Sequence, residues 1–385
     1  MKKLAIITTH PIQYYAPVFK RLAKNCDLNV FYTWGNERNE ANYDPDFKQH
    51  IVWDIPLLEG YTYTYVKNTA KQPGSHHFYG IVNPTLIEEI NAFAPDAILV
   101  YGWAYQSHLK VLRHFKEKIP IWFRGDSTLL DEQKSWKSVL RQVLLKWVYK
   151  HVDKAFYVGA ANKAYFEKFG LKPDQLIFAP HAIDNKRFAD DRVQEAKSLR
   201  ERLGIPESEL LILFAGKLEQ KKDPEILLNA FLEIKKSQVH LLIVGNGDLA
   251  TRLKSGGINP HVHFMPFQNQ SQMPVVYQAC DLFCLPSKGP GETWGLAVNE
   301  AMAAGKAVLV SDKVGCAKDL VHDGQNGAIF EAGNISALKN KLISLLGKSD
   351  QLREMGQQSA HIIEHWTIEK QTQIIINELN ATEQH

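Results

Sequence analysis

Two carboxylates, Glu292 and Glu300, flank the point at which an apolar helix is expected to begin. Residues Gly295–Ala304 place apolar and small side chains at helical spacing, and Gly305 follows at a position that favours a helix C-terminus. The first N–H groups of such a helix, together with its macrodipole, form a site for a diphosphate. A carboxylate near phosphate is repelled unless hydroxyl groups donate to it, so a ribose best explains Glu300 and a second sugar best explains Glu292.

Each of these residues also has a simpler interpretation when it is taken alone. Glu292 is then a cap at the start of the helix, and Glu300 is a solvated helix residue, since glutamate usually lies on protein surfaces. The pair, with seven residues between its members, is more specific and favours the sugar-binding interpretation.

The elements around the pair are expected to form a strand, a loop, a helix and a second strand. The apolar run Leu282–Leu285 predicts a buried strand that Pro286 ends, and residues 287–292 form the loop. Ala307–Val310 is the apolar run that predicts the second strand.

Two lysines follow another predicted strand. Leu210–Ala215 is a continuous apolar run, typical of a parallel sheet, and it leads into Lys217 and Lys222. Cations near a helix start neutralise the charge that develops on a departing diphosphate. In isolation these lysines would be a solvated charge run, but their place at a strand-to-helix switch favours the phosphate-binding role.

Segment 281–312 resembles the Glu-x7-Glu motif of the retaining family-4 glycosyltransferases, which have the GT-B fold. The resemblance includes LPS before the loop and NEAMAAGKAVLVSD after it. It implies a nucleotide-sugar donor, with Glu300 on the ribose and Glu292 near the hydroxyls of the transferred sugar. The family usually has a small or aromatic pair after its first Glu, where this chain has Thr293 and Trp294. The resemblance implies further donor-site residues in this motif: Thr293, Trp294, Gly295 and Leu296.

Other parts of the C-terminal half resemble the same family. Lys217 and Lys222 match the basic residues of its pattern, and Asp223 replaces its glycine. A Gly-x-Gly turn resembles the one beside the nucleotide, although such a turn alone is weak support. Backbone groups near Phe267 are expected to meet the base. The donor-side residues implied here are Gly245, Asn246, Gly247 and Phe267.

In the N-terminal half, loops after predicted strands carry polar and aromatic side chains. Leu4–Thr8 predicts the first strand, and His10 and Gln13 lie in the loop after it, where doubly wound folds bind ligands. A capping role explains His10 equally well. The Gly-rich loop that many family members have here is absent. The expected acceptor-side residues are His10, Gln13 and Trp103.

Arg124 and Asp126 place a cation and a carboxylate after the predicted strand Pro120–Phe123. The resembled family often has a cleft-lining histidine in this region, and this chain has none there. Arg124 or Asp126 is therefore expected to take its place, with Asp126 orienting an acceptor hydroxyl. The other interpretation is an internal Arg–Asp pair that fixes the loop.

No metal and no cofactor are expected. Asp44-Pro45-Asp46 has the form of the Asp-x-Asp metal motif of a different glycosyltransferase fold, but no buried strand precedes it, which favours a solvated loop. The pair His76–His77 is too weak a signal for a metal. The cysteines fit neither a disulfide framework nor a zinc site, and they favour a reducing cytoplasm. They are Cys26, Cys280, Cys284 and Cys316.

Residues 135–150 predict an amphipathic helix with a basic face that contains Lys137, Arg141 and Lys150. Such a helix can dock on an anionic membrane surface, or its apolar stripe can pack on the core. The stripe consists of Trp136, Val139, Leu140, Val143, Leu144, Trp147 and Val148.

Length and composition limit the remaining classes. A chain of 385 residues exceeds one compact core, and a net charge of +3 gives no argument for a nucleic-acid partner. The apolar run at the N-terminus is too short for a signal peptide, and no segment is long enough to span a bilayer. We expect a cytoplasmic protein that is peripheral on the inner face of the plasma membrane.

Alternating strands and helices in two successive sets predict an α/β protein of two doubly wound Rossmann-like domains. The resemblance implies that they face each other across a cleft. The expected ranges are 1–185 for the acceptor domain, 186–365 for the donor domain, and 366–385 for a helix that crosses back.

The implied activity is a metal-independent, retaining transfer of a sugar from a UDP- or GDP-sugar to a glycan or lipid-linked acceptor, in cell-surface polysaccharide synthesis. The candidate catalytic residues are Glu292, Lys217, Lys222, Asp126 and Arg124. Two alternatives remain: a non-hydrolysing nucleotide-sugar epimerase and a catalytically silent nucleotide-sugar binding protein.

Overall fold

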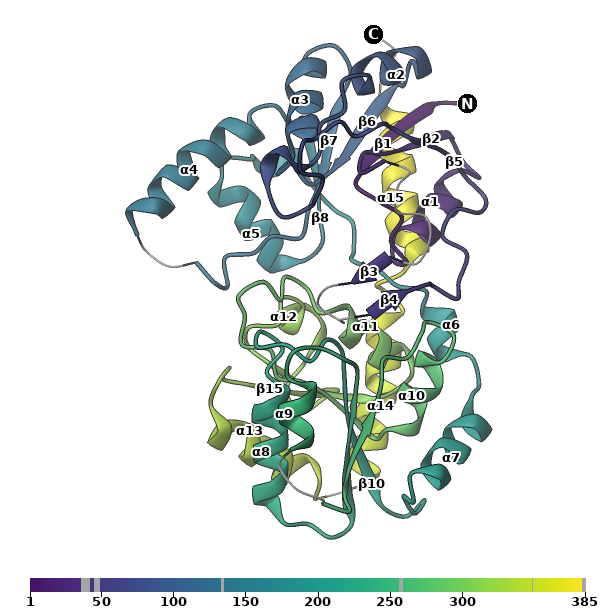
Figure 1. Ribbon diagram of the computed structural model, residues 1–385, viewed down its shortest axis with the longest axis vertical. Helices are drawn as coiled ribbons and strands as arrows, with labels where there is room; N and C mark the ends of the chain where they lie inside the picture. Colours follow the sequence, from purple (N-terminus) through teal and green to yellow (C-terminus); the bar gives the residue numbers. More distant parts are fainter. Residues whose placement is uncertain (36–41, 45–48, 133–134, 256–258, 348, 383–385) are drawn as a thin grey trace. The chain divides into compact units, whose positions relative to one another are not determined.

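The computed structural model describes residues 1–35, 42–44, 49–132, 135–255, 259–347 and 349–382 (Figure 1). The chain divides into two compact units. Unit 1 contains Met1–Ala41, Pro56–His181 and Ile368–His385, and unit 2 contains Asn42–Ile55 and Ala182–Thr367. Pro45 and Asp46 of the Asp-x-Asp motif lie outside the described residues.

Unit 1 is built on a parallel sheet with the strand order β5-β2-β1-β6-β7-β8-β9. Its central strands are continuous apolar runs because helices cover both faces. The order reverses direction between β1 and β6, and ligands bind at the carboxyl ends of strands at such a switch point. The strands are β1 (Lys3–Thr8), β2 (Asp27–Tyr32), β5 (Thr62–Tyr65), β6 (Ala97–Tyr101), β7 (Ile121–Arg124), β8 (Lys154–Tyr157) and β9 (Leu176–Phe178).

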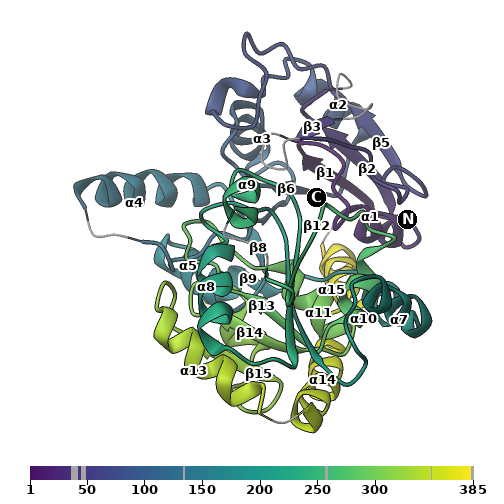
Figure 2. The same ribbon diagram turned by 60° about the horizontal axis from the view of Figure 1, so that its bottom comes forward.

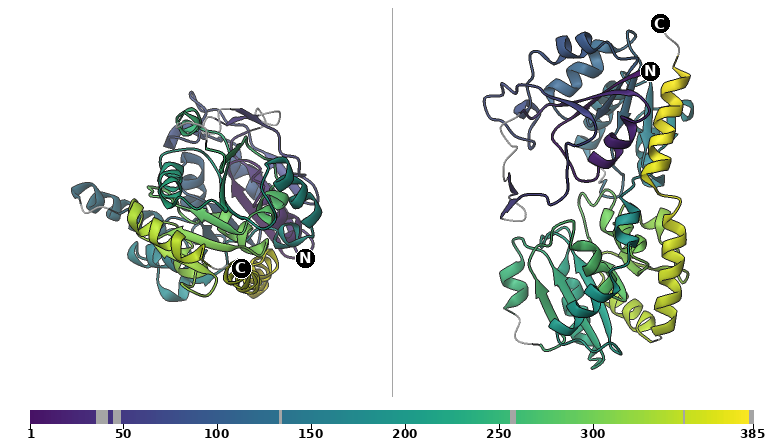
Figure 3. Two further views of the ribbon diagram at one scale, coloured as in Figure 1. Left: turned by 90° about the horizontal axis from the view of Figure 1, so that it is seen from below. Right: turned by 90° about the vertical axis from the view of Figure 1, so that its right-hand side faces the viewer.

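The helices of unit 1 include the last helix of the chain. That helix, α15, runs beside α1, where Arg21 and Glu369 form an ion pair of 3.3 Å (Figure 3). Two short 3₁₀ turns lie at Phe78–Gly80 and Pro173–Gln175. The helices are α1 (Ala16–Leu22), α2 (Leu86–Phe93), α3 (Gln106–Phe115), α4 (Trp136–Tyr149), α5 (Ala160–Lys168) and α15 (Ile368–Ala381).

Unit 2 has a second parallel sheet, with the strand order β12-β11-β10-β13-β14-β15. This is the strand order of a doubly wound fold, with its switch point between β10 and β13. The strands are β10 (Leu210–Ala215), β11 (Val239–Val244), β12 (Val262–Met265), β13 (Leu282–Leu285), β14 (Ala307–Ser311) and β15 (Gly327–Phe330).

Helices cover the sheet of unit 2 on both faces (Figure 2). Helices α8, α9 and α13 share one apolar core with the sheet, and α11 and α14 contact β13 and β14. The helices are α6 (Asn185–Ala189), α7 (Val193–Arg202), α8 (Pro224–Ile234), α9 (Ala250–Lys254), α10 (Met273–Ala279), α11 (Leu296–Ala303), α12 (Ala317–Leu320), α13 (Ile335–Leu345) and α14 (Ser349–Ile363).

A short segment from the first half of the sequence packs with unit 2. It contains the antiparallel pair β3 (Asn42–Asp44) and β4 (Gln49–Ile51). The side chain of Asn269 donates to the Val52 carbonyl at 2.6 Å, and the Ser271 N–H donates to the Asp54 carboxylate. These bonds hold Val52 and Asp54 in unit 2, to which Asn42–Ile55 belongs, although the range expected for the N-terminal domain was 1–185.

Helix α4 turns its apolar stripe away from the core of unit 1, with the exception of Val148. Leu145, Val148 and Tyr149 face the core, whereas the other apolar side chains of the helix are 40% to 70% exposed. The interpretation that the stripe packs on the core is therefore wrong for all of its residues except Val148, because Leu145, Val148 and Tyr149 are the side chains of α4 that belong to this core. The exposed residues are Trp136, Val139, Leu140, Val143, Leu144 and Trp147.

None of the described helices combines the length and the apolar composition needed to cross a bilayer.

Candidate functional site

Most of the expected donor-side residues of unit 2 lie on loops that follow the carboxyl ends of its strands, whereas Glu300 lies on α11. The loop after β10 carries Lys217 and Lys222, and the loop after β13 leads to Glu292. β10 and β13 are the neighbours at the switch point, so these loops lie where a doubly wound sheet binds its ligand.

The buried Glu292 forms an ion pair with the half-buried Lys222. Lys222 Nζ donates to Glu292 Oε2 at 2.7 Å, and Ser287 Oγ donates to the same oxygen at 2.8 Å. Glu292 is 7% exposed. Burial raises the pKa of Glu292, but the charge of Lys222 and the two hydrogen bonds outweigh it, so the pKa lies below its ordinary value. Glu292 is therefore an ionised hydrogen-bond acceptor at neutral pH.

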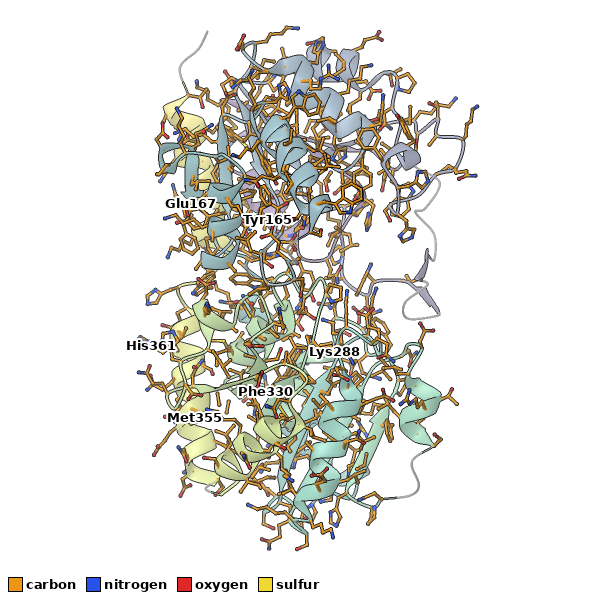
Figure 4. All side chains as sticks on the ribbon, turned by 90° about the vertical axis from the view of Figure 1, so that its left-hand side faces the viewer. Tyr165, Glu167, Lys288, Phe330, Met355 and His361 are labelled. Carbon is orange, nitrogen blue, oxygen red and sulfur yellow. The ribbon has the colours of Figure 1, made fainter. Side chains whose placement is uncertain are left out.

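Asp223 occupies the position where the resembled family has glycine. Its backbone is left-handed, with φ +48°, which explains why glycine suits the position. Asp is among the few other residues that adopt this conformation readily. Its buried carboxylate lies 3.2 Å from Nζ of Lys288, which is labelled in Figure 4 and lies on the loop after β13. The substitution therefore adds a second ion pair between the two loops.

Glu300 is a buried residue of α11. It is 4% exposed, and the hydroxyl of Tyr277 on α10 donates to its Oε2 at 2.8 Å. The interpretation of Glu300 as a solvated helix residue is therefore wrong. The Val298 N–H donates to the Gly295 carbonyl at 2.9 Å, so the N–H groups of Leu296 and Ala297, which precede this first helical bond, are the backbone donors at this place.

Trp294 belongs to the packing beneath the loop. Its side chain is 3% exposed, its indole N–H donates to Asn299 Oδ1 at 2.9 Å, and its ring lies 5.3 Å from that of Trp366. Its side chain is therefore structural, and its carbonyl accepts from the Cys316 N–H at 2.9 Å. Thr293 and Leu296, by contrast, are half-buried.

Close backbone contacts hold the loops in place. A Cβ on Gly245 would lie 1.9 Å from the Gly216 carbonyl oxygen, and a Cβ on Gly247 would lie 2.5 Å from that of Leu218. A Cβ on Gly315 would lie 1.7 Å from the carbonyl oxygen of Thr293. These positions therefore require glycine.

Phe267 lies beside a residue of the segment that precedes Pro56. The Phe267 N–H donates to Asn246 Oδ1 at 3.4 Å, and its ring lies 6.2 Å from the ring of Trp53. The expected turn at residues 245–247 and Phe267 thus lie together. Trp53, which the sequence analysis did not single out, is their neighbour.

Unit 1 has a pocket of about 190 Å³ at its own switch point. Asp126 lines it, together with Tyr101 at the end of β6. The hydroxyl of Tyr101 is buried and has no hydrogen-bond partner among the described residues. The lining residues are Thr8, Thr9, Ile12, Tyr15, Tyr101, Gly102, Tyr105, Arg124, Gly125, Asp126, Val158 and His181.

Arg124 is a positively charged residue in the lining of this pocket. Its guanidinium donates to the carbonyls of Ala179 and Pro180 at 3.0 and 3.1 Å. It thus fixes the segment that leads out of unit 1. Burial, and then the charge of Arg124, lower the pKa of His181 to about 3, so this histidine is neutral at physiological pH.

The three expected acceptor-side residues lie beside this pocket rather than in its lining. His10 Nδ1 lies 2.9 Å from Thr9 Oγ1, and its ring packs edge-on against Trp34. Trp103 packs on the core of unit 1 and hydrogen-bonds Tyr149, and Gln13 is half-buried. The sequence feature that could have indicated this pocket is Tyr101, an aromatic residue at the end of the apolar run that forms β6.

The sequence of unit 2 matches a known family. Residues 195–361 match the model of "Glycosyl transferases group 1". A phosphatidyl-myo-inositol mannosyltransferase of Mycobacterium leprae is 29% identical over 221 residues, which cover 56% of this chain and 55% of the relative. A D-inositol 3-phosphate glycosyltransferase of Nocardia farcinica is 31% identical over 206 residues, covering 49% and 44%. The chain thus spans about half the length of the curated relatives it matches.

Solved structures resemble the whole chain. HepE of Anabaena, in complex with UDP and glucose, superposes with a TM-score of 0.74 at 19% identity, covering 99% of this chain and 100% of HepE. Sucrose-phosphate synthase from Thermosynechococcus elongatus gives a TM-score of 0.74 at 18% identity and covers both chains fully, at 100% each. Residues 195–361 thus match the group 1 glycosyl transferases, and the whole chain has the GT-B fold of two Rossmann-like α/β units that was predicted from its sequence.

Proposed function

We propose that this chain is a metal-independent, retaining glycosyltransferase. It moves a sugar from a nucleoside diphosphate sugar to a hydroxyl of a glycan or lipid-linked acceptor, in the synthesis of a cell-surface polysaccharide. The observation that carries the proposal is the ion pair between the buried Glu292 and Lys222 at the switch point, where Glu292 is also close in sequence to the start of α11. The match of residues 195–361 to group 1 glycosyl transferases supports it.

Each group of the donor has a partner of suitable chemistry in unit 2. Lysine has three N–H donors, so Lys222 can bind a phosphate oxygen while it holds Glu292. Lys217 and the first N–H groups of α11 are the other donors to the diphosphate. Glu300 accepts from the ribose hydroxyls, and Glu292 accepts from the hydroxyls of the transferred sugar.

The proposed reaction needs no separate base. The bond between the anomeric carbon and the diphosphate oxygen breaks, and the acceptor oxygen bonds to that carbon on the same face of the sugar. The proton of the acceptor hydroxyl passes to the departing phosphate oxygen. Lys217 and Lys222 stabilise the charge that develops on this leaving group, and Glu292 stays ionised because its pKa is lowered.

The relatives support the choice of substrates. Structures of HepE contain UDP and UDP-glucose, which favours a uridine nucleotide as the first donor to test. The mannosyltransferase of M. leprae is named for phosphatidyl-myo-inositol, which favours a lipid-linked acceptor.

Incubation with UDP- and GDP-sugars, with and without candidate acceptors, tests the proposal. We expect release of nucleoside diphosphate only when an acceptor is present, and NMR of the product should show that the anomeric configuration of the donor is kept. Conversion of the donor sugar without acceptor would indicate an epimerase. Nucleotide binding without any transfer would indicate a silent binding protein.

The pocket of unit 1 is proposed to bind the acceptor. Asp126 and the unpartnered hydroxyl of Tyr101 are then the groups that hydrogen-bond its hydroxyls. Asp126→Asn is expected to lower kcat/KM for the acceptor by about 10- to 100-fold, since a hydrogen bond to a charged group contributes about 1.5 to 3 kcal/mol. The dissociation constant of the donor nucleotide should not change.

Steady-state kinetics at varied acceptor concentration measure kcat/KM for the acceptor. Tyr101→Phe should lower this kcat/KM by less than Asp126→Asn does. Asp174→Asn, on the surface of unit 1, is the matched control. Near-normal turnover of a folded Asp126→Asn protein would remove Asp126 from the acceptor site.

The exposed stripe of α4 is proposed to bind an anionic membrane surface. Its exposed apolar side chains lie next to the exposed cations Arg141, Lys146 and Lys150. This combination suits insertion at the level of anionic headgroups, where apolar burial and charge attraction add. A lipid-linked acceptor would be presented at such a surface.

Co-sedimentation with vesicles tests this binding. We expect the protein to bind vesicles that contain phosphatidylglycerol, and to bind neutral phosphatidylcholine vesicles at least 10-fold more weakly. The triple variant Trp136→Gln, Leu140→Gln, Val143→Gln should lose binding. The control Ile343→Gln changes a similarly exposed apolar residue of unit 2 and should bind as the wild type does. Equal binding by the triple variant would rule out α4 as the contact.

A further inference from the structure

A carboxylate and two histidines lie close together at the amino-terminal ends of strands of the unit 2 sheet. The loops that carry Lys217, Lys222 and Glu292 follow the opposite, carboxyl ends. Glu209 immediately precedes β10, His240 is the second residue of β11, and His261 immediately precedes β12. Leu241 pairs with Val262 across β11 and β12, so the alternation of side chains brings His240 and His261 onto one face of the sheet. The cluster therefore joins the amino-terminal ends of three adjacent strands.

The three side chains converge. Their ligand atoms all lie within 4.8 Å of one another. His240 Nε2 lies 2.6 Å from Glu209 Oε2, and the rings of His240 and His261 are 4.7 Å apart. Nδ1 of His261 is buried and has no hydrogen-bond partner among the described residues. A buried imidazole nitrogen without a partner is costly unless a ligand satisfies it.

A fourth side chain orients the cluster. His263 Nε2 lies 2.9 Å from His240 Nδ1, so the ring nitrogen of His240 that faces away from Glu209 is held by a hydrogen bond. Histidines that bind metals usually have such a bond on their other nitrogen, because it fixes the tautomer and the orientation of the ring.

We propose that Glu209, His240 and His261 bind one Zn²⁺ ion. Zinc takes imidazole nitrogens and carboxylate oxygens at about 2.0 to 2.2 Å, so ligand atoms around it lie about 3.4 Å apart. The widest present spacing, at most 4.8 Å, needs a contraction of about 1.4 Å, and the 2.6 Å between His240 Nε2 and Glu209 Oε2 must widen by about 0.8 Å. Binding releases to solvent the proton shared by Glu209 and His240, and water completes the tetrahedron. Glu209 is the route to solvent, since its side chain is 21% exposed.

The ion would be structural rather than catalytic. The cluster lies at the amino-terminal ends of β10 and β11, whereas Lys217 and Gly245 follow their carboxyl ends. Six extended residues span about 20 Å, which is too far for the ion to touch the donor. The metal would cross-link β10, β11 and β12 at their amino-terminal ends and so increase the stability of unit 2. Sugar transfer remains independent of metal.

Zinc titration of the chelator-treated, full-length protein tests the site. We expect one zinc per chain by elemental analysis, a rise in Tm with ZnCl₂, and tetrahedral Co²⁺ absorption bands when cobalt is used as the probe. His261→Ala should lose all three signals while keeping the Tm of the metal-free wild type. His263→Gln should bind zinc about 10- to 100-fold more weakly.

His361 provides the matched control, because it is an exposed histidine on α14 (Figure 4). His361→Ala should bind zinc as the wild type does. The proposal is overturned if zinc leaves the Tm of the wild type unchanged. It is also overturned if His261→Ala binds zinc with unchanged affinity and stoichiometry.

Discussion

Lys222→Ala is expected to lower kcat by about 1000-fold or more and to reduce the free energy of unfolding by about 3 kcal/mol. The catalytic loss follows because each preorganised donor to a developing negative charge is worth about 100- to 1000-fold, and Lys222 also positions Glu292. The stability loss follows because the buried Glu292 carboxylate would keep only the bond from Ser287. Initial rates and urea unfolding measure the two effects.

Two further variants separate catalysis from stability. Lys222→Ala combined with Glu292→Gln removes the unpaired charge, so stability should largely return while turnover does not. Lys221→Ala is the control, since this neighbouring lysine is half-buried and pairs with Glu219 at 3.4 Å rather than with Glu292. Retained turnover in a folded double Lys217→Ala, Lys222→Ala protein would refute the role of both lysines.

The same pair predicts how stability depends on pH. In the wild type, the pKa of Glu292 lies below its ordinary value of 4.5, so its contribution to stability is complete above pH 4.5. That contribution is lost as the pH falls through the lower pKa of the folded state. In Lys222→Ala, burial dominates and raises this pKa, so the variant should gain stability relative to the wild type as the pH falls from 7 to 5. Urea unfolding at both pH values measures the difference.

Gly315→Ala is expected to destabilise unit 2 more than any other addition of a single methyl group. The added Cβ would lie 1.7 Å from the Thr293 carbonyl oxygen, so the turn at Gly315 must move away from the loop that carries Glu292. That movement breaks the bonds from the Gly315 N–H to the Glu292 carbonyl and from the Cys316 N–H to that of Trp294. We expect a loss of about 3 kcal/mol in stability and at least a 10-fold weaker affinity for the donor nucleotide.

Gly347→Ala is the matched control, because its Cβ would meet only ordinary contacts, the nearest at 3.5 Å. Its Tm should stay within about 2 °C of the wild type, whereas that of Gly315→Ala should fall by about 6 °C or more. A Gly315→Ala protein with the Tm and nucleotide affinity of the wild type would contradict the structure of this loop.

Much of the fold was predictable because buried parallel strands are continuous apolar runs. Such runs predicted β1, β10, β13 and β14, and their alternation with helices predicted two doubly wound units. The side of α4 that faces the core was not predictable, since periodicity shows that a helix has an apolar stripe but not which element covers it. The place of residues 42–55 in unit 2 was also missed, because it depends on side-chain bonds to Asn269 and Ser271.

The sequence predicted which segments carry the residues of the candidate site, but it did not predict which side chains contact one another there. Glu292 and Glu300 were recognised from their spacing, and both are buried in the structure. Their partners Lys222 and Tyr277 are distant in sequence or belong to another helix, so no local pattern pairs them. Trp294 has a structural role because its indole N–H bonds Asn299, which spacing alone does not reveal.

Calorimetric titration with nucleotides tests the central claim most directly. If the lysines and the start of α11 hold a diphosphate, UDP or GDP should bind the wild type at least 100-fold more tightly than the corresponding monophosphate. The double Lys217→Ala, Lys222→Ala variant should lose that preference while still binding the nucleoside part. Equal affinity of the wild type for diphosphate and monophosphate, or an unchanged preference in the double variant, would contradict the account.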